Sequence, residues 1–371
     1  MHKTYHRIVS ALFCVFFGGM ALLSLLLPDK TFSPLENRNL ADAPDFSWKC
    51  VFDGRFMDDA EEYISDQIAL RDEWVAIRAW CERLSGKKEN NGVYFADGET
   101  LISRVEEPDM QKLEKNIGFL NTLCERSGIP VYFGLIPSAA AVWHGRLPVG
   151  APTAAEDRYI RELYAQTDAQ IADVGASLFA HQDEDIYYRT DHHWTSLGAF
   201  YGANALFASM GLAPLDLSDY EKKTVSESFY GTSWSSAAAH WLPPDRIDVY
   251  VPDDGIEVVS NFTGKPVDGS LYVEARLSQK NQYAYFLGGN QPLCIVRSQT
   301  DGEKLLLIRD SYSDALAPFL TERFSEIHLF DPRYNLTGIQ DYIAENSIDR
   351  VLVLYSFSNF ATDPNLFLLA R

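Results

Sequence analysis

The chain has 371 residues, 46% of them hydrophobic, which is enough to bury the core of one large α/β domain with an appendage, or of two domains. Its formal net charge is −20 and its sequence pI is about 4.7. This acidity argues against nucleic acid as a partner, because that interaction requires a basic surface, and it equally disfavours broad electrostatic adhesion to anionic lipid.

The N-terminal segment predicts a membrane anchor. Lys3 and Arg7 flank an uncharged apolar run over residues 8–27, and a helix of this length spans about 30 Å, the thickness of a bilayer's hydrocarbon core. The basic flank predicts an inside N-terminus, with everything after Pro28 outside the cytoplasm. A cleaved signal peptide is the alternative, but the run is longer than a signal's apolar region and ends in a poor cleavage site. We therefore expect residues 1–28 to form an uncleaved, single-pass signal anchor in the cell membrane.

The five cysteines show no metal-binding pattern. Cys14 lies in the apolar run, and the other four, Cys50, Cys81, Cys124 and Cys294, have no CxxC spacing, so a structural zinc site is not expected. Export permits disulfides, but the sequence does not say which cysteines would pair, and free buried thiols are the simpler interpretation.

Residues 29–104 predict an extension between the anchor and the main domain. Residues 29–52 are rich in Pro, Asp and Asn, as is typical of a tether. Over residues 52–84 apolar side chains recur at three- and four-residue steps, which predicts helix. Apolar arms on either side of Ala96-Asp97-Gly98 then predict a β-hairpin.

From residue 105 to residue 371, helical and strand patterns alternate. Continuous apolar runs, typical of strands buried on both faces, cover residues 129–137, 304–309, 326–330 and 350–355, and shorter strands are expected at 177–179 and 283–287. Helical patterns cover residues 110–127, 154–173, 195–210, 315–322 and 339–346. The alternation predicts an α/β domain with a mostly parallel sheet wrapped by helices.

A crowded polar motif, Asp191-His192-His193-Trp194, stands just before the helix expected from residue 195. In an extended segment residues i and i+2 project to the same side, so Asp191 and His193 should point together and His192 away. An aspartate so placed holds an imidazole in one tautomer and stabilises the imidazolium. The pair is therefore the base half of a hydrolytic or acyl-transfer triad.

The nucleophile half requires a hydroxyl on a sharp turn between a strand and a helix, where the helix N-terminus lends its amides and positive dipole end. Ser311 meets this description, directly after the strand at 304–309 and before the helix at 315–322. Ser138, at the end of another expected strand, is the nearest rival. A simple helix N-cap is the alternative role for Asp310-Ser311.

Further side chains are expected around this chemistry. Gly289 and Asn290 end an expected strand and could together offer a backbone N–H and a side-chain amide to an oxyanion, and Arg333 could bind a carboxylate or an acyl oxygen. Tyr312 and Trp194 are expected to contact substrate, with a core position as the alternative for Trp194. No metal is expected, because adjacent histidines should face opposite ways and no third ligand follows at helical spacing.

The motif Asp191-His192-His193-Trp194 resembles the name-giving motif of the DHHW protein family. The resemblance extends, in chain order, to Glu36-Asn37-Arg38, Asp66-Gln67, Phe229-Tyr230-Gly231-Thr232, Phe286-Leu287-Gly288-Gly289-Asn290, Asp310-Ser311-Tyr312 and Asp331-Pro332-Arg333-Tyr334. This family is similar to the SGNH hydrolase-like proteins that O-acetylate alginate and other exopolysaccharides. The resemblance implies an SGNH hydrolase-like (flavodoxin-like) fold, with Asp191 as orienter, His193 as base and Ser311 as nucleophile. Arg309 departs from the pattern, because that group has Gly before its Asp-Ser.

The resemblance implies an exported, membrane-anchored O-acetyltransferase that modifies a cell-surface polysaccharide through an acyl-serine, without a cofactor of its own. Because acetyl-CoA is absent outside the cytoplasm, it also implies a membrane-bound O-acyltransferase as the source of acetyl groups. Two alternatives stay open. The same triad would make a carbohydrate esterase if water were the acceptor, and Arg309 favours a non-catalytic glycan-binding or assembly protein.

Overall fold

The computed structural model describes residues 2–33 and 35–371. These residues divide into two compact units. The smaller comprises the chain up to Asn90 together with Ser235–Trp241, and the larger comprises Asn91–Trp234 and Leu242–Arg371. The hairpin expected around Gly98 therefore falls in the larger unit.

The smaller unit is mainly helical. Its helices are α1 (His2–Leu26), α2 (Trp48–Phe52), α3 (Arg55–Gln67) and α4 (Arg71–Leu84), and its two-residue strands are β1 (Phe32–Ser33), β2 (Arg38–Asn39) and β3 (Glu89–Asn90). The stretch Thr4–Leu26 is long and apolar enough to cross a membrane, a test that an N-terminal signal sequence also passes. The helical structure expected over residues 52–84 is confirmed, but it consists of two helices. The break lies between α3 and α4, where Leu70 has a φ of 59°.

A buried carboxylate fastens the tether to α3. Asp66 accepts hydrogen bonds from the Arg38 guanidinium (Nη1 to Oδ2, 2.8 Å) and from the Ala41 backbone N–H (2.9 Å). Gln67 donates to the backbone carbonyls of Lys30 (2.9 Å) and Ala41 (3.0 Å). The sequence clusters around Arg38 and Asp66 thus belong to one structural contact within the smaller unit.

The larger unit is built on an eight-stranded sheet of order β11-β10-β12-β14-β13-β15-β6-β7. The strands are β6 (Val131–Ile136), β7 (Gln170–Ile171), β10 (Glu257–Ser260), β11 (Val267–Asp268), β12 (Leu293–Arg297), β13 (Lys304–Arg309), β14 (Glu326–Phe330) and β15 (Arg350–Ser356). From β14 to β7 the neighbours are parallel, whereas β12, β10 and β11 join in antiparallel fashion at the edge. The expected α/β fold with a mostly parallel sheet is confirmed, and so is the β-α-β-α-β order of its C-terminal third.

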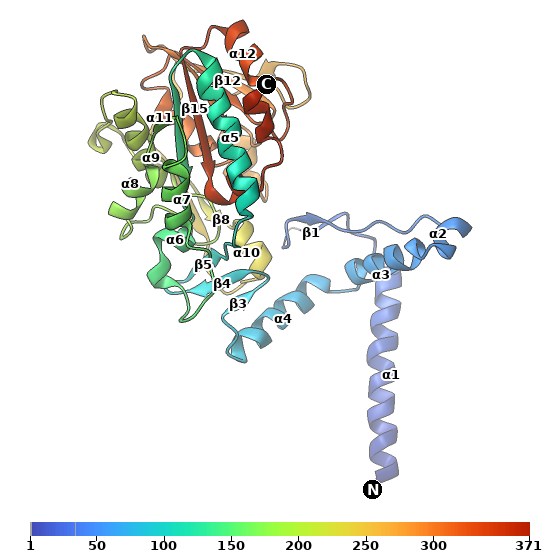
Figure 1. Cartoon of the computed structure of the whole chain (residues 1–371). Coiled ribbons are helices and arrows are strands. Elements are labelled where there is room, and N and C mark those ends of the chain that lie inside the picture. Colours follow the sequence, from blue (N-terminus) through green and yellow to red (C-terminus); the bar gives the residue numbers. More distant parts are fainter. Residues whose placement is uncertain (1, 34) are drawn as a thin grey trace. The chain divides into compact units, whose positions relative to one another are not determined.

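Helices cover both faces of this sheet. They are α5 (Met110–Ser127), α6 (Ala139–Val142), α7 (Glu156–Tyr164), α8 (Val174–Ala180), α9 (Ser196–Ser209), α11 (Ser313–Leu320), α12 (Ile339–Asn346) and α13 (Phe357–Thr362). A further helix, α10 (Thr232–Ala237), begins in this unit and ends in the smaller one. In Figure 1, α5 lies on one side of β15 and α9 and α11 lie on the other. The central strands are buried on both faces as a result, which explains their continuous apolar sequences.

Two hairpin-like pairs complete the larger unit. The first joins β4 (Val93–Ala96) to β5 (Thr100–Ser103), which confirms the expected hairpin, and the second joins β8 (Lys223–Phe229) to β9 (Asp245–Val249). In the first turn Gly98 has a φ of 73°, a left-handed conformation that glycine adopts without strain.

Three expectations about elements were wrong. The helix expected over 154–173 is only Glu156–Tyr164, and the strand expected at 177–179 lies inside α8. The strand expected at 283–287 is a 3-10 turn, Gln282–Tyr285. The antiparallel strand β12, which lies between β10 and β14, was not expected. The two strand errors concern short segments, in which apolar periodicity does not separate strand from helix.

Candidate active site

Ser311 stands on the turn between β13 and α11, as its sequence position predicted. The preceding residue, Asp310, is completely buried and holds this turn. Its Oδ1 accepts the backbone N–H of Tyr312 (3.1 Å), and its Oδ2 accepts the backbone N–H and hydroxyl of Ser356 (2.9 and 2.7 Å) and the amide of Asn359 (2.7 Å). The carboxylate therefore fastens the Ser311 turn to the carboxyl end of the neighbouring strand β15.

The Asp191-His192-His193-Trp194 segment is a closed loop that leads into α9. The backbone N–H of Tyr188 donates to His193 O (3.1 Å), and Thr195, the N-cap of α9, donates to Ile186 O (2.9 Å). Asp245 of β9 fastens the start of the loop by accepting the Thr190 backbone N–H (2.7 Å) and hydroxyl (2.6 Å).

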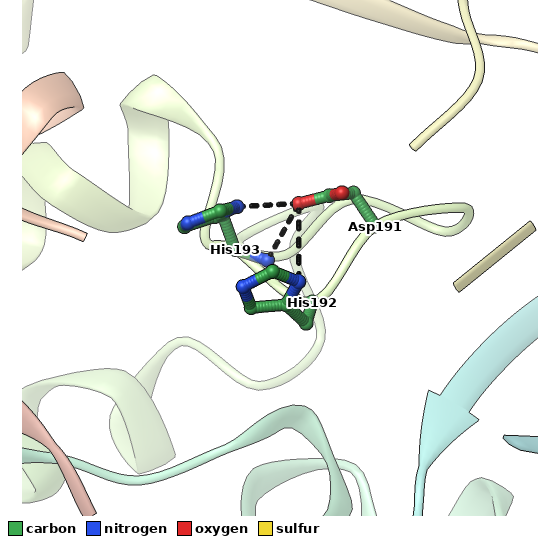
Figure 2. A group of neighbouring side chains, drawn as sticks. All are labelled: Asp191, His192 and His193. Atoms are coloured by element: carbon green, nitrogen blue, oxygen red, sulfur yellow. Dashed lines mark hydrogen bonds and ion pairs between the residues drawn. The ribbon is translucent and has the colours of Figure 1, made fainter. Parts of the chain in front are cut away.

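These two segments bring Ser311, His193 and Asp191 into one hydrogen-bonded chain. His193 Nε2 lies 2.8 Å from Ser311 Oγ, and His193 Nδ1 lies 2.5 Å from Asp191 Oδ1 (Figure 2 shows the second contact). His193 and Asp191 are buried, with 6% and 3% of their surface exposed. The order hydroxyl, imidazole, carboxylate is that of a nucleophile with its base and orienter.

The surroundings of Asp191 keep its carboxylate ionised. Besides the His193 ring, it accepts the backbone N–H of His193 (3.0 Å) and the backbone N–H and hydroxyl of Thr232 (2.7 and 3.0 Å). Burial by itself would raise the pKa of Asp191, but the electrostatic interaction with the two neighbouring imidazoles and these hydrogen bonds outweigh it and hold that pKa well below its usual range. Asp191 can therefore stabilise a positive charge on His193.

Three contributors to this arrangement were not expected as site residues. Tyr283 stacks on the His193 ring, with centroids 3.9 Å apart and planes at 11°, and its hydroxyl donates to Ser311 O (3.2 Å). Gly231 and Thr232 belong to the Phe229–Thr232 cluster that carried part of the family resemblance. Thr232 supplies two of the hydrogen bonds to Asp191, and a Cβ on Gly231 would lie 2.6 Å from Asp191 Cγ.

The expectation that His192 faces away from His193 was wrong. The two rings lie beside each other with centroids 3.9 Å apart (Figure 2), because the closed loop does not keep the side-chain alternation of a strand. Ligand atoms of Asp191, His192 and His193 all lie within 4.8 Å of one another, a spacing that a metal ion could use. However, each Asp191 oxygen already accepts two hydrogen bonds and both His193 nitrogens are engaged, so this donor set fits proton transfer better.

Two of the expected substrate contacts occupy other roles in the structure. Trp194 is completely buried and its indole N–H donates to Tyr312 O (2.9 Å), so it packs in the core, the alternative considered for it. Tyr312 is also buried, with its hydroxyl donating to His192 O, and it contributes to the wall of a cavity described below.

Gly289, Asn290 and Arg333 are not placed against Ser311 by any hydrogen bond among the described residues. Gly289 and Asn290 do not end a strand, and the N–H of Gly289 donates to Phe286 O (3.3 Å). Arg333 binds Asp331 through two bonds of 2.9 and 2.7 Å. Their roles toward an acyl oxygen stay predictions.

A cavity of about 310 Å³ adjoins the triad. Asp191, His192 and Tyr312 form its wall toward the catalytic candidates, and the ends of β6 and β15 supply Ser138 and Ser356. The rival nucleophile Ser138 is hydrogen-bonded to Glu156, whose Oε2 also accepts the Ser138 backbone N–H (2.9 Å). Among the described residues no histidine is hydrogen-bonded to Ser138, so Ser311, which contacts His193, is the better candidate for a nucleophile.

A family model described as DHHW protein matches residues 155–330, a range that contains Asp191, His193 and Ser311. The resemblance to the DHHW family is confirmed. A DHHW family protein from Eubacterium siraeum is 27% identical to this chain, with a TM-score of 0.66, and the match covers 76% of this chain and 95% of that one.

Two other solved structures resemble this chain, and no curated protein matches it. PatB1 from Bacillus cereus, determined with a sulfonyl adduct, is 22% identical with a TM-score of 0.63, covering 75% of this chain and 98% of PatB1. The O-acetyltransferase domain of Pseudomonas putida AlgJ is 16% identical with a TM-score of 0.46, covering 73% and 93%. The likeness to PatB1 shows that the two share a fold.

Proposed function

We propose that this protein is an exported, membrane-anchored O-acetyltransferase that modifies a cell-surface polysaccharide through an acyl-Ser311 intermediate. The observation that carries the proposal is the continuous chain from Ser311 Oγ through His193 to Asp191, with contacts of 2.8 and 2.5 Å. The likeness of the DHHW family to polysaccharide O-acetyltransferases supports the choice of reaction, and the apolar helix Thr4–Leu26 supports an anchor.

In the first half of the reaction, Ser311 Oγ attacks the carbonyl carbon of an acetyl ester while His193 Nε2 takes the hydroxyl proton. Asp191 stabilises the imidazolium through Nδ1. The bond between the acetyl carbon and the donor oxygen breaks, and the donor leaves with the proton that His193 returns. Asn290, Gly289 and Arg333 are proposed to contact the developing oxyanion.

In the second half, a sugar hydroxyl attacks the acetyl-Ser311 carbonyl and gives its proton to His193. The bond from the acetyl carbon to Ser311 Oγ breaks, and Ser311 recovers its proton from His193. Because acetyl-CoA is absent outside the cytoplasm, the donor is proposed to be a membrane-bound O-acyltransferase. Water in place of the sugar would give a carbohydrate esterase with the same residues.

The buried position of Arg309 weakens the case for a non-catalytic protein. The Arg309 side chain is 0% exposed and its Nη1 lies 2.8 Å from Asp314 Oδ1, so it points into the interior and leaves the Ser311 turn unobstructed. The departure from glycine at this position is therefore compatible with an intact triad.

The test uses the full-length chain in detergent, with p-nitrophenyl acetate as donor, with and without oligosaccharide acceptors. We expect p-nitrophenol release and an acetyl adduct on Ser311 detected by peptide mass spectrometry. Ser311→Ala should abolish both, and Ser278→Ala, at an exposed serine, should abolish neither. Equal p-nitrophenol release by wild type and Ser311→Ala would remove Ser311 from the mechanism, and free acetate without acetylated sugar would identify an esterase.

A further inference from the structure

The Thr232 hydroxyl bridges Asp191 and His192, and its single proton determines the tautomer of His192. Thr232 Oγ1 lies 3.0 Å from Asp191 Oδ2 and 2.7 Å from His192 Nδ1. Because an ionised carboxylate can only accept, the Thr232 proton must point to Asp191. The hydroxyl oxygen is then an acceptor toward His192, so His192 Nδ1 carries a proton and His192 Nε2 does not.

His192 Nε2 is consequently a hydrogen-bond acceptor without a partner among the residues that the structure describes. It lies on the side of the ring away from Asp191 (Figure 2), and 40% of the His192 side chain is exposed. The partial withdrawal of the ring from water, together with the neighbouring His193, lowers the pKa of His192 to about 4, so the ring is neutral at physiological pH.

The exposed part of His192 borders the cavity of about 310 Å³ beside the triad. The polar lining of the rest of this cavity is mostly hydroxyl and amide groups, from Ser103, Ser138, Ser356, Ser358 and Asn359, together with the charged side chain of Arg104. The apolar lining includes Ile136 and Phe357. Neutral hydroxyl and amide groups beside apolar surface suit a ligand rich in hydroxyls. The volume is at the lower end of the range for small-molecule sites, about 300–1,000 Å³, and is compatible with a single sugar ring.

We propose that this cavity is the acceptor subsite, that it takes one hydroxylated sugar ring, and that His192 Nε2 accepts a hydrogen bond from a non-reacting hydroxyl of that ring. The inference rests on the proposed acetyl transfer and assigns separate tasks to the adjacent histidines. His193 takes the proton of the attacking hydroxyl, and His192 holds the sugar so that it competes with water for acetyl-Ser311.

Two substitutions distinguish the hydrogen bond made by Nδ1 of His192 from the one proposed for its Nε2. In His192→Asn the amide nitrogen takes the place of Nδ1 and can still donate to Thr232, but no acceptor remains at the Nε2 position. In His192→Gln the amide oxygen takes the place of Nε2 and restores that acceptor. His144→Asn is the matched control, since His144 is exposed and does not line this cavity.

The measurement is the ratio of acetylated sugar to free acetate from p-nitrophenyl acetate, with cello-oligosaccharide, chito-oligosaccharide and oligouronate acceptors and the full-length chain in detergent. We expect His192→Asn to lower this ratio about fivefold and to raise the acceptor KM by a similar factor, as loss of one hydrogen bond implies. His192→Gln should recover most of the ratio, and His144→Asn should not change it.

The proposed role of Nε2 as acceptor would be overturned if wild type and His192→Asn gave equal ratios of acetylated sugar to free acetate. It would also be overturned if His192→Asn and His192→Gln lowered this ratio equally. Acetate release by the wild type without transfer to any of these acceptors would overturn the acceptor subsite, while the acyl-Ser311 step would still stand. Failure of the proposed function itself is distinguishable, because it would appear as acetate release that Ser311→Ala does not reduce.

Discussion

Arg309 and Asp314 form an ion pair that is buried directly behind the Ser311 turn. The two charged atoms lie 2.8 Å apart, and the side chains are 0% and 2% exposed. Burial by itself would lower the pKa of Arg309, but Asp314 and Asp331 more than offset this and raise it. For Asp314 burial dominates and raises the pKa to about 6. Only the aspartate can therefore become neutral within the ordinary pH range.

Because only Asp314 can become neutral, we expect the free energy of unfolding to fall by different amounts when Asp314 or Arg309 is replaced. Asp314→Leu leaves a guanidinium that cannot deprotonate, and should lower the free energy of unfolding by about 3–5 kcal/mol. Arg309→Met should cost less, because Asp314 can take up a proton, and the double variant should be more stable than Asp314→Leu alone. Urea unfolding of the full-length chain at pH 7 measures all three. An Arg309→Met cost equal to or above that of Asp314→Leu would contradict the argument.

Glu156 predicts a pH-dependent stability. Burial raises its pKa to about 7, from an ordinary value of 4.5, against the opposing hydrogen bonds from Ser138. The folded state therefore retains a proton that the unfolded chain has lost, so this stabilisation is fully present below pH 4.5 and is lost as the pH rises to about 7. Above pH 7, the free energy of unfolding of the wild type should therefore have fallen by about 3 kcal/mol relative to that of Glu156→Gln, whose side chain is neutral at every pH.

The measurement compares the free energy of unfolding of wild type and Glu156→Gln between pH 4.5 and pH 8. Because the other carboxyl groups are common to both proteins, the difference isolates Glu156. A difference that does not change over this interval would show that Glu156 has an ordinary pKa.

The parallel half of the sheet was predictable because its strands are apolar on both faces. Residues 326–330 and 339–346 have the bounds expected for them, and residues 304–309 form the expected strand before Ser311. The short segments were not predictable in this way. Residues 177–179 lie in a seven-residue helix that packs on α9. Tyr283 lies in the 3-10 turn Gln282–Tyr285 and stacks on the His193 ring.

The residues that support the site were harder to predict than the candidate catalytic residues. Asp191, His193 and Ser311 could be found because each stands in a local sequence context that their chemistry requires. Thr232 and Tyr283 lie 41 and 28 residues from their partners Asp191 and Ser311. Without the fold, no local pattern links residues at such separations, although the Phe229–Thr232 cluster was visible as part of the family resemblance.

Gly231 allows close approach to Asp191, which predicts a position-specific effect of Gly231→Ala. A Cβ there would lie 2.6 Å from Asp191 Cγ, well inside van der Waals contact, and would push the carboxylate away from His193. We expect p-nitrophenyl acetate turnover to fall about 100-fold, as misplacement of a catalytic group by about 1 Å can cause. Gly118→Ala is the control, because a Cβ at that position meets nothing within 4 Å. Full turnover in Gly231→Ala would show that Asp191 is not needed in its present position.

Substitutions of Tyr283 can separate the effect of its stacking on the His193 ring from the effect of its hydrogen bond to Ser311 O. Tyr283→Phe keeps the ring against His193 and removes only the hydroxyl that donates to Ser311 O, so we expect a modest loss of stability, about 1 kcal/mol, and near-normal turnover. Tyr283→Leu also removes the stacked ring, worth about 0.5–1.5 kcal/mol for an aromatic pair, and should lower kcat two- to tenfold. The donor KM should stay constant, because Tyr283 acts on the donor only through the orientation of His193. Steady-state kinetics with p-nitrophenyl acetate tests this, and a rise in KM with unchanged kcat would mean that Tyr283 contacts the donor directly.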